Sequence, residues 1–164
     1  LTWFAPGDLD PTDSGPGAGT DLDLHFMHPF AADWFDQPFD CFWFNPNPNW
    51  GSWDPTVDDD PSLFLDSTDG SGPESLVYDT MEVDSPYRIG VHVWSDQGFG
   101  PIEATIGISW GGELLYEATV TLEDRDLWEV ATLHWTSGDL EVLQDDQGAP
   151  LVLPDYMNPF FSEP

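Results

Sequence analysis

The sequence predicts an all-β fold, an antiparallel β-sandwich of the Ig-like or jelly-roll-like kind. No stretch of the chain shows sustained helical periodicity. Short segments of alternating apolar and polar residues recur instead at near-regular spacing, as in β-sandwich proteins. Turns rich in Gly and Pro separate these segments, and the pair Gly111-Gly112 is a strong signal for a two-residue hairpin.

The expected strands follow one another from residue 21 onward. Leu22, Leu24 and Phe26 alternate with polar residues, which predicts a strand over 21–26 with one apolar face and one polar face. Further strands are expected at 62–66, 75–83, 87–95, 102–110, 113–122 and 128–135, with a short one at 39–44.

The 164 residues suffice for one domain, which we place at 21–138. Residues 1–20 are predicted to form a lead-in loop, and 139–164 an extended, partly apolar C-terminal tail. The tail either packs on its own sheet or adds a strand to the sheet edge of a neighbouring molecule. A long Trp- and Pro-rich loop at 29–61 interrupts the domain, and its aromatic side chains are expected to anchor it to the sheet: Trp34, Trp43, Trp50 and Trp53, together with Trp3 nearer the start.

The charge of the chain restricts its partners. Two basic residues stand against 32 acidic ones, a formal net charge of −30, and the chain contains no lysine. Such a charge repels phosphate backbones and anionic lipids, so we expect no nucleic-acid partner and no membrane insertion. Asp outnumbers Glu by 23 to 9, and Asp in loops is a frequent oxygen ligand of calcium.

Five acidic residues form the candidate metal site. Asp21 and Asp23 lie two apart on one predicted strand, so their side chains leave the same face of the sheet. Asp66, Asp69 and Glu74 flank a Gly-rich turn that also offers main-chain carbonyl groups. If strand and turn are neighbours, these oxygens can bind calcium, which takes six to eight such ligands. The alternative is a solvated acidic surface that serves as a salt adaptation.

The remaining polar residues are assigned structural roles. The run 58–60 is expected to be a solvated loop, and Asp96 to shape a turn. His25 and His92 are predicted to be hydrogen-bonded structural histidines, and Cys41 a buried thiol. No Gly-x-Ser-x-Gly elbow, His-Glu-x-x-His motif or phosphate-binding loop is present, so we expect a non-catalytic protein.

Three motifs in order resemble the YfaP-like (DUF2135) β-sandwich domains: Asp21 to His25, Asp66 with Gly70 to Glu74, and Tyr87 to His92. The longer runs at 39–48 and 87–100 resemble the version found in large surface proteins of myxobacteria and their relatives. The resemblance covers about residues 1–137.

This resemblance implies an all-β, non-catalytic extracellular module. Asp21, Asp23, Asp66 and Glu74 fall on acidic positions of the family, whereas Phe64 stands where the family often has a further acid. We therefore expect a secreted or cell-surface module that binds calcium and has a structural or adhesive role. Its expected partners are further copies joined head to tail into a fibre, other surface proteins or polysaccharide. The alternative function is a carbohydrate-binding module that uses exposed Trp side chains.

Overall fold

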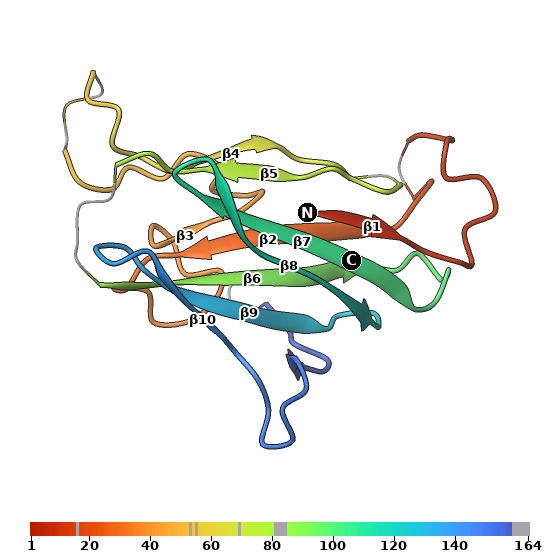
Figure 1. Ribbon diagram of the computed structural model, residues 1–164. Helices are drawn as coiled ribbons and strands as arrows, with labels where there is room; N and C mark the ends of the chain where they lie inside the picture. Colours follow the sequence, from red (N-terminus) through yellow and green to blue (C-terminus); the bar gives the residue numbers. More distant parts are fainter. Residues whose placement is uncertain (16, 53, 55, 69, 81–84, 159–164) are drawn as a thin grey trace.

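The structure, a computed structural model, describes residues 1–158 except 16, 53, 55, 69 and 81–84, and all regular elements in this part of the chain are β-strands (Figure 1). The predicted all-β class is therefore confirmed. The strands are β1 (Thr2–Phe4), β2 (Asp21–Met27), β3 (Asp40–Cys41), β4 (Ser62–Leu65), β5 (Ser75–Val77), β6 (Pro86–Ser95), β7 (Ile102–Trp110), β8 (Glu113–Leu122), β9 (Leu127–His134), β10 (Asp139–Val142) and β11 (Leu151–Leu153). Within the described ranges, no helix has the length and hydropathy needed to span a membrane.

Two antiparallel sheets form the sandwich, and a separate hairpin lies at one edge. The larger sheet has the order β10-β9-β6-β2-β3, with β11 also paired to β9, and the smaller has the order β1-β7-β8. Strands β7 and β8 cross in front of β2, β6 and β9 (Figure 1). The hairpin β4–β5 is a two-stranded sheet of its own.

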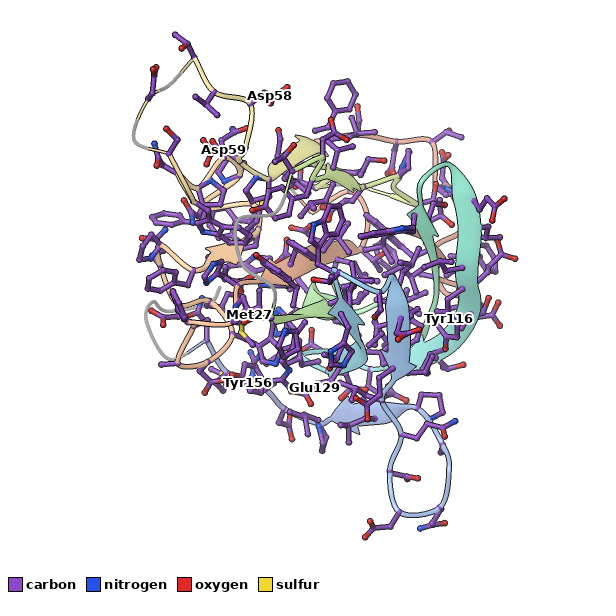
Figure 2. The ribbon with its side chains drawn as sticks, turned by 60° about the vertical axis from the view of Figure 1, so that its left-hand side comes forward. Met27, Asp58, Asp59, Tyr116, Glu129 and Tyr156 are labelled. Carbon is purple, nitrogen blue, oxygen red and sulfur yellow. The ribbon has the colours of Figure 1, made fainter. Side chains whose placement is uncertain are left out.

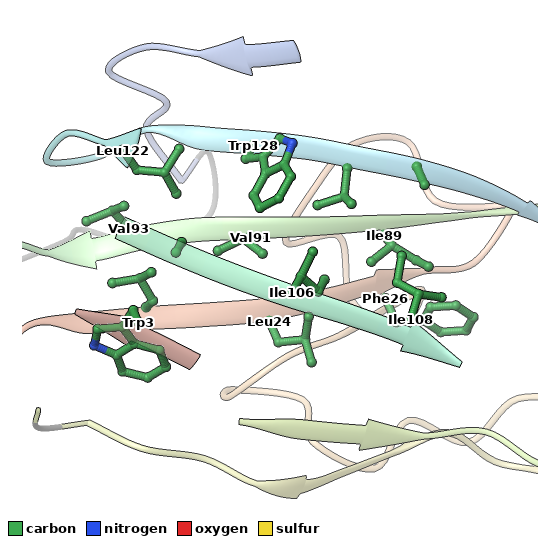
Figure 3. Packing of buried hydrophobic residues seen from close by; sticks show 14 of the residues in the cluster. Trp3, Leu24, Phe26, Ile89, Val91, Val93, Ile106, Ile108, Leu122 and Trp128 are labelled. Carbon is green, nitrogen blue, oxygen red and sulfur yellow. The ribbon is translucent and has the colours of Figure 1, made fainter. Parts of the chain in front are cut away.

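The main core lies between the two sheets. Apolar residues at alternate positions of β2, β6, β7 and β9 point into it, as period-two side-chain alternation requires. Figure 3 shows Ile106 and Ile108 of β7 facing Leu24, Phe26 and Ile89 of the larger sheet.

The opposite face of the larger sheet is also covered, which corrects the predicted polar face of the strand at 21–26. On β2, the side chains of Asp23, His25 and Met27 are at most 5% exposed. The loop after β2 returns over this face and forms a second apolar cluster: Met27, Trp34, Phe35, Phe42 and Leu127, with Tyr156 packed against it. In Figure 2, Met27, Glu129 and Tyr156 lie together on one side of the molecule, and Tyr116 of β8 lies on the other.

Trp34 anchors the loop as predicted. Its ring is 1% exposed, and its Nε1 donates a hydrogen bond of 2.9 Å to Oε1 of Glu129 on β9. Arg88 pairs with the same carboxylate, and its guanidinium lies 5.0 Å from the centre of the Trp34 ring. Trp50 is likewise buried and donates to the Pro38 carbonyl, whereas Trp53 lies outside the described residues.

The two ends of the chain are more regular than the sequence predicted. The lead-in begins with β1, whose Thr2 to Phe4 pair with β7. In the tail, β10 pairs with residues 131–134 of β9 and β11 pairs with residues 127–129, on the same edge of that strand. The described part of the tail therefore packs on its own sheet, one of the two alternatives considered, and residues 159–164 are outside the described part. The expected strands at 39–44 and 75–83 are shorter than predicted, and 81–83 are not described.

Replacing Gly90 of β6 with Ala is expected to lower the free energy of unfolding by about 1–3 kcal/mol, because overpacking a filled core is destabilising. An added Cβ would lie 2.8 Å from Cη2 of the buried Trp34 ring. The matched control is Gly107→Ala on β7, where the Cβ meets Leu114 at an ordinary 3.6 Å and the strand gains a better residue than Gly. Urea unfolding measures both variants, and equal stabilities would contradict the close packing of Trp34 on β6.

Candidate metal site

The hairpin β4–β5 brings two acidic residues to one place. Leu65 pairs with Ser75 in the hairpin register. Asp66 directly follows β4 and Glu74 directly precedes β5, so the two acids face each other at the base of the connecting loop. Pairing of the two strands therefore places them together, although they are eight residues apart in sequence.

The third acid comes from β2. One carboxylate oxygen from each of Asp23, Asp66 and Glu74 lies within 4.8 Å of the others. Asp23 is 2% exposed and Glu74 1% exposed, whereas Asp66 lies at the surface. We call these three residues the carboxylate cluster; it is open to solvent on the side of Asp66.

Main-chain donors hold the Glu74 side chain in the cluster. Its Oε2 accepts a 2.7 Å hydrogen bond from the N–H of Leu24, and its Oε1 accepts a 3.4 Å bond from the N–H of Ser67. Strand β3 pairs only with Phe26 and Met27 of β2, which leaves the edge of β2 at Leu24 accessible to this side chain.

The N-terminal segment contacts residues 70–72 of the loop between Asp66 and Glu74. The N–H of Trp3 donates to the Ser71 carbonyl at 3.1 Å, and Oγ1 of Thr20 donates to the Gly70 carbonyl at 3.1 Å. Gly72 packs directly against the Trp3 ring and has a φ of 80°, so this position favours glycine on both counts. These bonds fix residues 70–72, which belong to the described part of the turn beside the cluster.

Burial raises the pKa of the Glu74 carboxyl group from its usual 4.5 to about 9. The hydrogen bond from Leu24 lowers it, and the neighbouring Asp66 carboxyl raises it further. In the absence of a cation, Glu74 is therefore protonated at neutral pH. Three carboxylates this close repel one another unless a proton or a cation neutralises them.

Calcium fits the spacing of the cluster. Two oxygens that bind one calcium ion at about 2.4 Å are at most about 4.8 Å apart. All three carboxylates can therefore reach a single ion, and water and main-chain oxygens can complete the six to eight ligands. The two arginines are engaged elsewhere, Arg88 with Glu129 and Arg125 with Asp124.

The structure brings together three of the five predicted ligands. Asp23, Asp66 and Glu74 form the cluster, as expected for a strand and turn that are neighbours. Asp21 lies two residues before Asp23 at the start of β2 and is not part of this group. Asp69 lies outside the described residues.

The run 58–60 is solvated only in part, because two of its three acids are half-buried and bind main-chain groups. Asp60 accepts from the Trp50 N–H at 2.6 Å and Asp59 from the Ser52 N–H at 2.9 Å, while Asp58 is exposed. Figure 2 shows Asp58 and Asp59 in a projecting loop. Asp96 accepts from the Gly98 N–H at 2.8 Å and shapes a turn, as predicted.

The histidines are structural, as predicted. Nδ1 of His25 lies 2.7 Å from Oδ2 of Asp40, and the same oxygen accepts a 2.7 Å bond from the N–H of Phe35. Nε2 of His92 is hydrogen-bonded to the Tyr156 carbonyl at 3.1 Å, and burial followed by the nearby His25 lowers the pKa of His92 to about 3. Asp40 and Glu129 are buried acceptors that the sequence did not predict. Glu129 bonds to Trp34, 95 residues away, and Asp40 meets His25 because β3 pairs with β2.

Cys41 is a buried thiol, as predicted, with no exposed surface. Burial, followed by the neighbouring Asp40 carboxylate, raises the pKa of the thiol to about 12. A nucleophilic cysteine needs a lowered pKa and access to solvent, and Cys41 has neither.

Comparison with protein-family models, curated proteins and solved structures finds no match to this chain. The resemblance to the YfaP-like domains therefore stays a prediction. The fold and the carboxylate cluster must be interpreted from their own geometry.

The cation-free protein is expected to lose stability as the pH rises from about 4.5 to about 9, because the folded state holds the Glu74 proton that the unfolded state releases. The contribution of this one group is at most about 1.4 kcal/mol per pH unit. Glu74→Gln should flatten this dependence and should make the cation-free protein more stable than wild type at pH 8, since Gln still accepts from Leu24.

The control for this experiment is Glu117→Gln, which removes the same charge from the exposed face of β8. Chemical unfolding in chelator across the pH range measures all three proteins. If Glu74→Gln and Glu117→Gln show the same pH dependence as wild type, the buried protonated carboxyl group is refuted.

Proposed function

We propose that this chain is a non-catalytic calcium-binding β-sandwich module with a structural or adhesive role, secreted or at the cell surface. The observation that supports this most is the convergence of Asp23, Asp66 and Glu74 from two segments more than 40 residues apart, with two of the three side chains buried. Burial of a charged group is costly unless a partner compensates it, and a divalent cation is such a partner.

The position of the cluster supports a structural role for the cation. The hairpin β4–β5 is a separate two-stranded sheet, and Glu74 reaches the main-chain N–H of Leu24 on β2. A cation bound by Asp23, Asp66 and Glu74 would cross-link the hairpin to β2 of the larger sheet. The tight His25–Asp40 pair is fully buried among aromatic rings, so substrates have no access to it, which favours binding over catalysis.

The extracellular location follows from the chemistry that we propose. Calcium modules outside cells work with affinities of about 10⁻⁴–10⁻³ M, which a partly exposed three-carboxylate site can supply. A net charge of −30 also attracts divalent cations to the surface. The described tail pairs with β9 of its own chain. This favours a self-contained module over one whose tail adds a strand to the sheet of a neighbouring molecule.

The alternative of a carbohydrate-binding module based on the early Trp side chains has less support. Trp3, Trp34 and Trp50 are at most 3% exposed, so their faces are filled by the protein itself. Sugar stacking needs accessible aromatic faces. We therefore favour an anchoring role for these three residues.

Calcium is expected to raise the melting temperature of the wild-type protein by about 5–10 °C at a hundredfold excess over Kd, which corresponds to about 2.7 kcal/mol. Sodium chloride at matched ionic strength should raise it less, because screening gives only the non-specific part of the effect. Asp23→Asn and Asp66→Asn should lose the calcium-specific part, since each removes one ligand charge.

The matched control variant is Asp58→Asn, which removes one exposed charge outside the cluster. It should keep the full calcium-specific shift. Equal stabilisation of the wild type by calcium and by sodium chloride would indicate a salt-adapted surface and would overturn the proposed site.

A further inference from the structure

A cavity opens between the two sheets next to the hairpin. It has a volume of about 190 Å³. Polar residues contribute to its lining (His25, Glu74, Ser75 and Ser109), and six apolar residues form the part that we call the apolar inner wall: Leu24, Phe26, Ile89, Ile106, Ile108 and Leu133. Because β4–β5 is hydrogen-bonded into neither larger sheet, this edge of the sandwich is not closed by strand pairing. A cavity of about 150 Å³ already accommodates a benzene-sized molecule.

Aromatic side chains form the mouth of this cavity. Trp110 at the end of β7 and Trp135 just after β9 lie with ring centres 3.8 Å apart at an angle of 72°. Both rings and Tyr78 are half-buried, and all three also line an adjoining open hollow of about 800 Å³. The two indole rings thus form a corner of nearly perpendicular faces, which we call the Trp corner.

The negative charge around the mouth favours a cationic ligand over an anionic one. Asp79 lines the outer hollow and carries a negative charge there. The whole chain carries a formal charge of −30. Aromatic faces attract cations through their quadrupoles, and the surrounding field repels anions.

We propose that this cavity binds a small organic cation, a quaternary alkylammonium whose short apolar chain enters between the sheets and whose charged head lies against the Trp corner. The apolar inner wall offers the chain a place out of water, and the indole faces stabilise a weakly hydrated cation. Glu74 lies between this cavity and the carboxylate cluster, whose other two members, Asp23 and Asp66, do not line the cavity.

The test is a titration of ¹⁵N-labelled protein with n-pentyltrimethylammonium, followed through the indole N–H signals of Trp110 and Trp135. We expect saturable shifts at ligand concentrations up to about 10 mM. Tetramethylammonium lacks the apolar chain and n-pentanol lacks the charge, so each should bind at least about tenfold more weakly. The affinity for n-pentyltrimethylammonium should be the same in the presence of calcium and in the presence of chelator.

Variants distinguish the cavity from the general acidic surface. Trp110→Leu and Trp135→Leu should each weaken binding about tenfold, whereas Trp94→Leu should not, since Trp94 packs against Trp43 on the opposite face of the larger sheet. Ile108→Phe fills the inner cavity and keeps both Trp side chains of the corner. It should reduce the affinity for n-pentyltrimethylammonium to that for tetramethylammonium.

Three results would overturn the proposal. The first is the absence of a saturable shift. The second is equal affinity for n-pentyltrimethylammonium and tetramethylammonium, and the third is equal affinity for n-pentyltrimethylammonium and n-pentanol. The Ile108→Phe spectrum also reports whether the variant is folded, so the test does not depend on the Trp variants alone.

Discussion

The buried carboxylates of this acidic chain set the main constraint on its fold. Two of the described interior acids, Glu129 and Asp40, are paired with basic side chains. Glu129 accepts from Trp34 and pairs with Arg88, and Asp40 pairs with His25. The carboxylate cluster differs, because two of its three members are acidic neighbours buried side by side. Three carboxylates this close repel one another, so our proposal is that a proton or a cation neutralises the cluster and stabilises the hairpin β4–β5 on β2.

Much of the fold could be predicted because its signals are local. The period-two pattern and the Gly111-Gly112 turn predict β7 and β8 at their observed bounds. The burial of His25 could not be predicted in this way, since Trp34 and Phe35, which pack against it, come from a loop without regular structure. The strand at Thr2–Phe4 was also missed, because three residues carry too little periodicity and the partner lies 100 residues later.

In the candidate site, too, the residues could be predicted from local sequence signals, whereas their contacts could not. Asp23, Asp66 and Glu74 were recognisable as acids on a strand and at a Gly-rich turn, but their contact depends on the register of β4 with β5. The cavity beside them had no sequence signal, because Trp110 ends β7 of one sheet and Trp135 follows β9 of the other. Both sites share the hairpin, which supplies Glu74 to the cluster and Leu76 to the cavity wall.

Calorimetric titration of calcium into chelator-treated protein at pH 7, in two buffers with different protonation enthalpies, tests the central claim most directly. With the pKa of Glu74 at about 9, its carboxyl group must lose a proton when the ion binds. The account predicts one calcium per chain and the release of about one proton per ion. Binding without proton release, or no binding beyond that seen for sodium, would contradict it.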